Sequence, residues 1–212
     1  MREAANPRCC CKRLIEPRPT RRNDKTVMTP WELPQTTTIG GVRYQLNADF
    51  RDVLEIMEYL NDPEKPEILR WQIAVAIFFG CEDFPEEHLQ EAMEYLAAFI
   101  SCGDESSASA PKLLDWEQDA QIIVADVNRV AGMEVRSVPY LHWWTFLSYF
   151  RAIGEGQLLT LVSIREKLRT GKKLEQWERE YYHKNPERVI LKTKYLAEEE
   201  DELDALKRLL GG

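Results

Sequence analysis

The sequence lacks the long hydrophobic run that a membrane-spanning helix requires. Its longest apolar stretch, Ile73 to Gly80, is far shorter than the roughly 18 to 20 residues that cross a bilayer. A charged fraction of 30% and a mean hydropathy of -0.45 accompany this absence. We therefore expect a soluble protein that has no membrane partner.

Motifs for catalysis, metal binding and phosphate binding are also missing. The run GEGQ at 154–157 lacks the spacing of a phosphate-binding loop, EEH at 86–88 lacks the second histidine of a zinc-protease helix, and three adjacent cysteines at 9–11 are poorly placed to chelate one metal. His142 has no recognisable nucleophile or carboxylate beside it, so we interpret it as a histidine on a helix flank. We predict no catalytic residues, no cofactor and no metal, with scattered carboxylates as the one enzymatic alternative.

Charge is distributed unevenly along the chain. Residues 1–27 carry eight Lys and Arg against three acidic residues, a net +5, whereas residues 28–212 carry 20 against 33, a net -13. An acidic body argues against nucleic acid as a partner, because that binding is dominated by cations that neutralise phosphates. A basic protein partner fits the acidic body better, although simple solubility would explain it as well.

The first 27 residues differ from the rest of the chain. They are broken by charges and prolines and show no sustained period, which predicts disorder. Because the pattern changes at Met28, we hypothesise that residues 1–27 come from an upstream start or a reading-frame artefact. The absence of an apolar signal region and the odd number of cysteines predict a protein made in a reducing cytoplasm.

Residues 28 to about 190 are expected to form a single compact, mainly α-helical domain. TTTIGGVRYQL, which begins at Thr36, predicts a short β-hairpin around Gly40–Gly41. Helical spacing and capping signals then predict about six to seven helices, interrupted by a flexible loop at residues 101–112. These helices are expected near residues 47–60, 62–79, 85–100, 115–131, 139–153, 157–169 and 173–184.

The stretch VPYLHWWTFLSYF, residues 138–150, holds two tryptophans, two tyrosines and two phenylalanines. On an ideal helix one stripe, which we interpret as core, consists of Trp143, Phe146, Leu147 and Phe150. Tyr140, Trp144 and Arg151 lie at the edge of this stripe, and their residue types often anchor interfaces. Two interpretations stay open: the whole segment is core, or these three residues rim a surface that binds a partner.

Residues 191–212 predict an acidic amphipathic helix. Its apolar face consists of Leu196, Leu203, Leu206 and Leu210. The helix is either a solvated flank or an arm that docks into a partner or into a sister subunit of a homo-oligomer. We keep Leu203, Leu206 and Leu210 as candidates for binding.

Three blocks of the sequence resemble the bacteriophage gene product fifteen family of tailed phages. The first block is TTTIGGVRYQLNADFR at 36–51, the second is residues 113–153 and the third is IREKLRT at 164–170. The strongest part of the match is LHWW, Leu141 to Trp144, together with Phe146. The resemblance covers roughly residues 36–190 and brings no known catalytic residues.

This resemblance implies a protein of tail morphogenesis, encoded near the tape measure gene. It implies a chaperone-like, non-enzymatic protein in the cytoplasm of the infected bacterial host, which binds the tape measure protein or a second tail assembly chaperone. The alternative is a structural tail or neck subunit that is retained in the virion. A surplus of aromatic side chains and an amphipathic end are compatible with reversible contact with exposed apolar helices.

Overall fold

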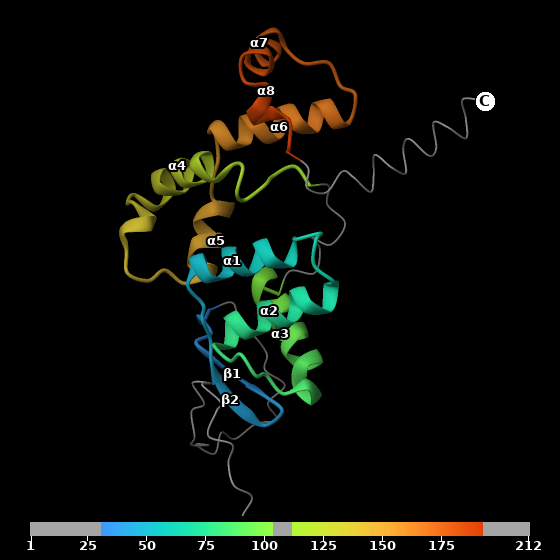
Figure 1. Ribbon diagram of the computed structural model, residues 1–212. Coiled ribbons are helices and arrows are strands. Elements are labelled where there is room, and N and C mark those ends of the chain that lie inside the picture. The colour runs from blue at the N-terminus through green and yellow to red at the C-terminus, as the bar shows by residue number, and fades with distance from the viewer. Residues whose placement is uncertain (1–30, 104–111, 193–212) are drawn as a thin grey trace, which may run out of the picture. The chain divides into compact units, whose positions relative to one another are not determined.

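The computed structural model describes residues 31–103 and 112–192. Residues 1–27, most of the loop at 101–112 and nearly all of the predicted C-terminal helix lie outside these ranges, and with them Leu203, Leu206 and Leu210. The described chain contains eight α-helices and one two-stranded antiparallel hairpin (Figure 1). The predicted class, mainly α with a short N-terminal β-hairpin, is confirmed. None of the described helices combines the length and the apolar character needed to span a membrane.

The chain divides into two compact units. Within the described residues, unit 1 contains 31–103 and 137–148, and unit 2 contains 112–136 and 149–192. Helix α5, Trp143–Arg151, contributes its first residues to unit 1 and its last turn to unit 2. Periodicity does not predict this division, because the boundary falls inside a continuous helix.

The hairpin of unit 1 forms where the sequence predicts it. Strands β1, Thr36–Ile39, and β2, Val42–Gln45, pair antiparallel with Ile39 opposite Val42. Gly40 and Gly41 have φ values of 55° and 76°, the left-handed conformation that a two-residue hairpin turn of this kind requires. A Cβ at Gly40 would lie 2.2 Å from the His88 ring, so an added side chain would also have to displace that ring.

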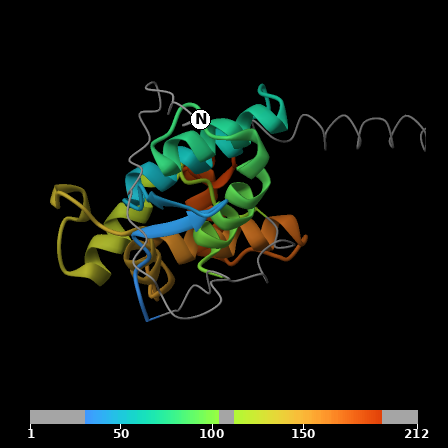
Figure 2. The same cartoon turned by 90° about the horizontal axis from the view of Figure 1, so that it is seen from below.

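Three helices complete most of unit 1. They are α1, Phe50–Leu60, α2, Glu67–Phe79, and α3, Leu89–Ser101, which the 3₁₀ turn η1, Glu86–His88, precedes. The hairpin lies beside α2 and α3 (Figures 1 and 2), where the Gly40 N–H donates to Glu91 Oε2 at 2.9 Å and the Asn47 N–H donates to the Phe78 carbonyl at 2.8 Å. The rings that fill the contact belong to Tyr44, Phe78, Phe79, Phe84 and Phe99.

Unit 2 is built from four helices and a small core. The helices are α4, Ala120–Ala131, α6, Gln157–Arg169, α7, Gln176–Lys184, and the single turn α8, Pro186–Val189. The core consists of Leu161, Ile164, Leu174 and Val189. Asp126 of α4 fixes the start of α6, because its carboxylate accepts the Leu158 N–H at 3.0 Å.

Several predicted helices begin later than their sequence signals indicate, and α2, for example, begins at Glu67 rather than directly after Asp62. Residues 116–119 form a turn rather than the first turn of α4, and the Asp115 carboxylate accepts the Gln118 N–H of this turn at 2.8 Å. The predicted helix at 139–153 begins only at Trp143, after the 3₁₀ turn η3, Val135–Ser137. Residues 138–141 lie outside both helices, and their backbone pairs elsewhere in unit 1, where the Leu141 carbonyl accepts the Phe50 N–H at 2.9 Å.

Candidate partner-binding surface

Two segments that are far apart in the sequence lie side by side in unit 1. The Gln35 side-chain amide donates to the Tyr140 hydroxyl at 3.1 Å, and the His142 ring Nε2 lies 3.1 Å from the Pro34 carbonyl oxygen. Pro34 and Gln35, directly before β1, therefore contact residues 140–142, which lead into α5.

Asp49 joins this pair of segments to α1. Its carboxylate accepts the Arg51 N–H at 3.0 Å as the N-cap of α1, and it accepts the Leu141 N–H at 2.9 Å. The Arg51 guanidinium pairs with the same carboxylate at 3.0 Å and also donates to the Val138 carbonyl at 2.8 Å. Because one carboxylate serves a cap, an ion pair and a loop amide, the position of residues 138–142 is tightly specified.

His142 is buried where these segments meet, with 2% of its surface exposed. Its Nδ1 accepts the Trp144 N–H at 3.1 Å, so the proton of the neutral ring lies on Nε2, which donates to the Pro34 carbonyl. Burial lowers the pKa of His142, which the hydrogen bond to Pro34 only partly offsets. His142 therefore acts as a neutral hydrogen-bonding bridge at the start of α5.

Acidification should weaken unit 1 through His142. Because burial holds its folded-state pKa below the unfolded value, the unfolded chain binds the proton more readily. The contribution of His142 to stability is complete above the unfolded pKa of about 6.5 and is lost as the pH falls toward the folded-state pKa. Urea unfolding at about pH 7.5 and about pH 5.5 should show that the free energy of unfolding decreases less with acidification for His142→Gln than for the wild type. The exposed control His183→Gln should keep the full decrease, and an unchanged decrease in His142→Gln would contradict the assignment.

The two segments carry large apolar side chains that are not covered. Trp31 is 93% exposed, Leu33 49% and Tyr140 48%. We call these three residues the Trp31 surface. Partial burial and the nearby carboxylates of Asp49 and Asp52 raise the pKa of Tyr140, so its phenol stays protonated at neutral pH. The surface thus presents two aromatic rings and one aliphatic side chain. Hydrogen bonds of Asp49, Arg51 and His142 hold the segment that carries Tyr140.

The aromatic stripe of α5 is core in unit 1, and one of its expected edge residues is core as well. Trp143 and Phe146 are each 1% exposed and Leu147 is also buried, which confirms the core interpretation for these three. Trp144 is buried, and its indole N–H donates to the Phe99 carbonyl at 2.9 Å. The expectation that Trp144 rims an exposed surface is therefore wrong. Phe150 is half-buried and packs against Trp116 in unit 2.

The remaining edge residues fall in different units. Tyr140 is exposed in unit 1, and Arg151 is exposed in unit 2. Binding of a partner through either residue stays a prediction. Sequence reasoning missed Trp31 and Leu33, although a tryptophan between Pro30 and Pro34, outside any periodic element, was a signal that it lies on the surface.

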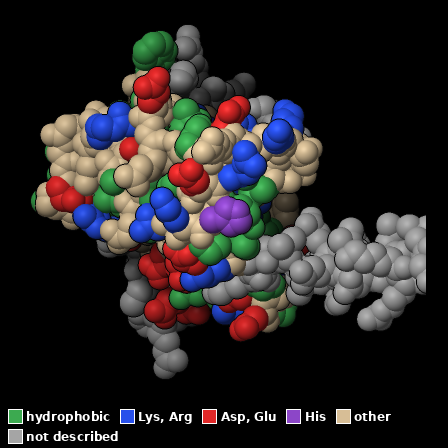
Figure 3. Space-filling model, turned by 90° about the horizontal axis from the view of Figure 1, so that it is seen from above, with side chains coloured by type: hydrophobic (Ala, Val, Ile, Leu, Met, Phe, Trp, Pro, Cys, Tyr) green, Lys and Arg blue, Asp and Glu red, His purple; other side chains and the backbone are tan. Residues whose placement is uncertain are grey.

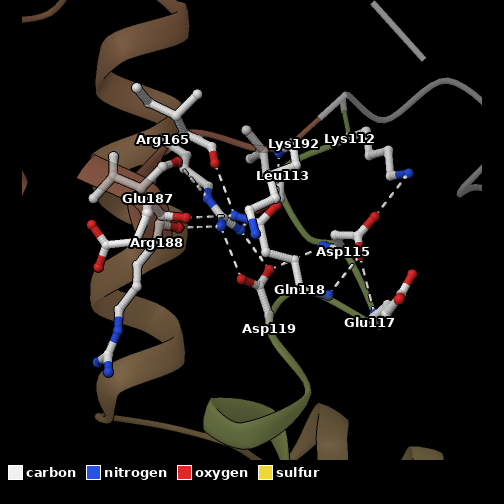
Figure 4. A network of polar contacts seen from close by, with 12 residues as sticks. Lys112, Leu113, Asp115, Glu117, Gln118, Asp119, Arg165, Glu187, Arg188 and Lys192 are labelled. Carbon is white, nitrogen blue, oxygen red and sulfur yellow. Dashed lines mark hydrogen bonds and ion pairs between the residues drawn. The ribbon is translucent and has the colours of Figure 1, made fainter. Parts of the chain in front are cut away.

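Unit 2 contains a second polar cluster, which is shown in Figure 4. The Arg165 guanidinium donates to both carboxylate oxygens of Asp119, at 2.6 and 2.9 Å, and the two side chains are only 4% and 2% exposed. The same guanidinium donates to the carbonyls of Leu113, Arg188 and Val189 at 3.0, 2.6 and 2.9 Å. Every part of the planar fork is engaged, so the cluster is suited to holding chain segments together rather than to moving protons.

Gln118 extends this cluster along the end of the described chain. Its amide nitrogen donates to the carbonyls of Glu187 and Ile190 at 3.1 and 2.8 Å, and its amide oxygen accepts the Lys192 N–H at 2.7 Å. Residues 187–192 are thereby tied to residues 113–119 (Figure 4). Within the described ranges, no group of three or more His, Cys, Asp and Glu side chains could hold a metal ion.

Comparison with known proteins gives one match. A family model described as Bacteriophage Gp15 protein matches residues 31–191, well over half of the chain and including residues of both units. The match begins at Trp31, five residues before the resemblance seen in the sequence, and ends within one residue of it. Searches of curated proteins and of solved structures gave no match.

Proposed function

We propose that this chain, which belongs to the bacteriophage Gp15 family, is a non-enzymatic tail assembly protein with a chaperone-like function. Membership of the family suggests a phage structural or assembly protein. The finer proposal is that the chain binds the tape measure protein, or a partner assembly chaperone, in the cytoplasm of the infected host. The contact would be reversible, and tail subunits would later replace it.

The Trp31 surface is the observation that supports a binding function. Exposed Trp and Tyr side chains are the residue types that most often dominate binding energy at protein interfaces. Tyr140 lies on a segment that Asp49, Arg51 and His142 hold in place through hydrogen bonds of 2.8–3.1 Å, and Trp31 lies three residues before Pro34, which His142 contacts. A side chain on a backbone segment that is held in place, such as Tyr140, loses less conformational entropy on binding, which favours its use in docking.

The buried ionisable groups support binding rather than catalysis. Among the described residues, the buried Asp, Glu, His and Arg side chains are Asp119, Asp126, His142, Arg165 and Glu178, and each makes hydrogen bonds within its own unit. A general acid or base has to reach a substrate proton, whereas these groups already bind backbone amides, carbonyls or an ion-pair partner. We therefore assign them structural roles.

Co-expression with the tape measure protein tests the proposal. The chain should keep the tape measure protein soluble and co-purify with it, and the double variant W31A/Y140A should reduce recovery about tenfold or more, because two aromatic anchors are lost. The control Trp177→Ala removes an indole of unit 2 that is 54% exposed, and recovery should not change.

Two outcomes would count against the chaperone function. Solubility and recovery of the tape measure protein could be indifferent to the chain, in which case the proposed contact does not exist. Alternatively, mass spectrometry of purified particles could find the chain at high abundance in mature virions. That result would support a structural tail or neck subunit instead.

A further inference from the structure

The acidic character of the chain is concentrated in unit 1. Its described residues carry 14 Asp and Glu against four Lys and Arg, a formal net charge of -10. The described residues of unit 2 carry 11 Asp and Glu against 13 Lys and Arg, a net charge of +2. The face of the molecule drawn in Figure 3 shows basic side chains interspersed with acidic and hydrophobic ones. Charge therefore distinguishes the two units.

Acidic groups also lie around the Trp31 surface itself. Glu32 stands between Trp31 and Leu33 and is exposed. The carboxylates of Asp49 and Asp52 are close enough to Tyr140 to act on its phenol. Arg51 pairs with one of these carboxylates, Asp49, at 3.0 Å. The apolar side chains are thus set in a region of negative potential, which favours a partner of opposite charge.

The same charges argue against a second copy of this chain as the occupant. A symmetric dimer through the Trp31 surface would bring two identical faces together, each on a unit whose described residues carry a net charge of -10. Like charges placed opposite one another across an interface oppose association. The occupant should instead carry positive charge beside its apolar contact residues.

We propose that the Trp31 surface binds a partner segment in which apolar side chains are flanked by Lys and Arg. The inference rests on the proposed function, because it states the chemistry of the partner at the same surface. The apolar side chains of the segment cover Trp31, Leu33 and Tyr140, which supplies most of the affinity. The basic residues meet the negative potential of unit 1, which speeds association and makes it sensitive to salt.

Two synthetic peptides test this chemistry. Both carry the same leucine stripe at helical spacing, and their polar faces are either all lysine or all glutamate. Each is labelled with fluorescein and titrated with the full chain, and anisotropy reports binding. The lysine peptide should bind about tenfold or more tightly than the glutamate peptide, and its affinity should fall between about 50 mM and about 300 mM NaCl.

Matched variants locate the binding. Trp31→Ala should lower the affinity for the lysine peptide about tenfold, whereas Trp177→Ala in unit 2 should leave this affinity unchanged. Glu32→Lys should lower this affinity more than Glu117→Lys does. Glu117 is also exposed, lies in unit 2, and undergoes the same change of charge. Equal binding of the two peptides would overturn the proposal. So would equal effects of the two tryptophan variants, or of the two charge variants.

The result can be separated from that of the co-expression experiment. If the lysine peptide binds at Trp31 while the tape measure protein is indifferent to the chain, the partner chemistry stands and the chaperone function fails. If the tape measure protein co-purifies but Trp31→Ala and Glu32→Lys have no effect on it or on the peptides, the function stands and this surface assignment fails.

Discussion

Arg165→Met should lower the free energy of unfolding by about 3–5 kcal/mol, because it leaves a buried carboxylate without its partner. Asp119 is 2% exposed and accepts two hydrogen bonds from the Arg165 guanidinium. The carbonyls of Leu113, Arg188 and Val189 would lose donors in the same change. Methionine preserves much of the side-chain volume, so the loss would come from electrostatics and hydrogen bonding rather than from a cavity.

Urea unfolding followed by circular dichroism would measure this change. Arg169→Met is the matched control on the same helix, since Arg169 makes only an exposed ion pair with Glu166, and its unfolding midpoint should be close to that of the wild type. Adding Asp119→Leu to Arg165→Met should restore part of the lost stability, because the buried charge is removed. A midpoint for Arg165→Met equal to that of Arg169→Met would show that the buried pair contributes little.

Local signals predicted most of the elements but not this pair. The hairpin follows from Gly40–Gly41, whose conformation depends on neighbouring residues alone. Arg165 and Asp119, in contrast, are 46 residues apart, and the chain offers 28 basic and 36 acidic residues from which to choose. Nothing in the local pattern selects one pairing, because the contact depends on how α6 packs in unit 2.

The prediction that Tyr140 and Trp144 share one edge of the helix fails for a geometric reason. The predicted stripe assumes a helix from residue 139, but α5 begins at Trp143 and the backbone before it pairs with the segment that leads into α1: the Leu141 carbonyl accepts the Phe50 N–H at 2.9 Å. A spacing of 100° per residue therefore does not relate Tyr140 to Trp144. Tyr140 points outward from a non-helical segment, whereas Trp144 in the first turn of α5 reaches α3 and donates to Phe99.

The exposed surface was the hardest feature to predict from the sequence. Burial depends on which elements cover a side chain, and residues 31–35 belong to no periodic element. Two of them, Pro34 and Gln35, contact His142 and Tyr140, more than 100 positions away. The sequence could indicate that tryptophan and tyrosine occur, but only the fold shows that Trp31 and Tyr140 stay uncovered while Trp143 and Trp144 do not.

Trp143→Ala should destabilise unit 1 by about 3–5 kcal/mol, the cost typical of truncating a large core aromatic residue. Trp143 is 1% exposed, stacks on Phe146 with ring centroids 5.8 Å apart, and donates its indole N–H to the Ile100 carbonyl at 2.9 Å. The change would leave both a cavity and an unsatisfied carbonyl near the end of α3.

Trp143→Phe separates these two contributions. Phenylalanine keeps most of the buried ring but loses the N–H. The free energy of unfolding should therefore fall by about 1–3 kcal/mol, clearly less than for alanine. Urea unfolding of the full chain measures both variants, and Trp177→Ala, which removes an indole that is 54% exposed, should change the midpoint little. Equal decreases for Trp143→Ala and Trp177→Ala would be incompatible with a core role for the LHWW segment. A graded series, from Trp177→Ala through Trp143→Phe to Trp143→Ala, is expected because burial, rather than residue type, determines the energetic contribution of each tryptophan.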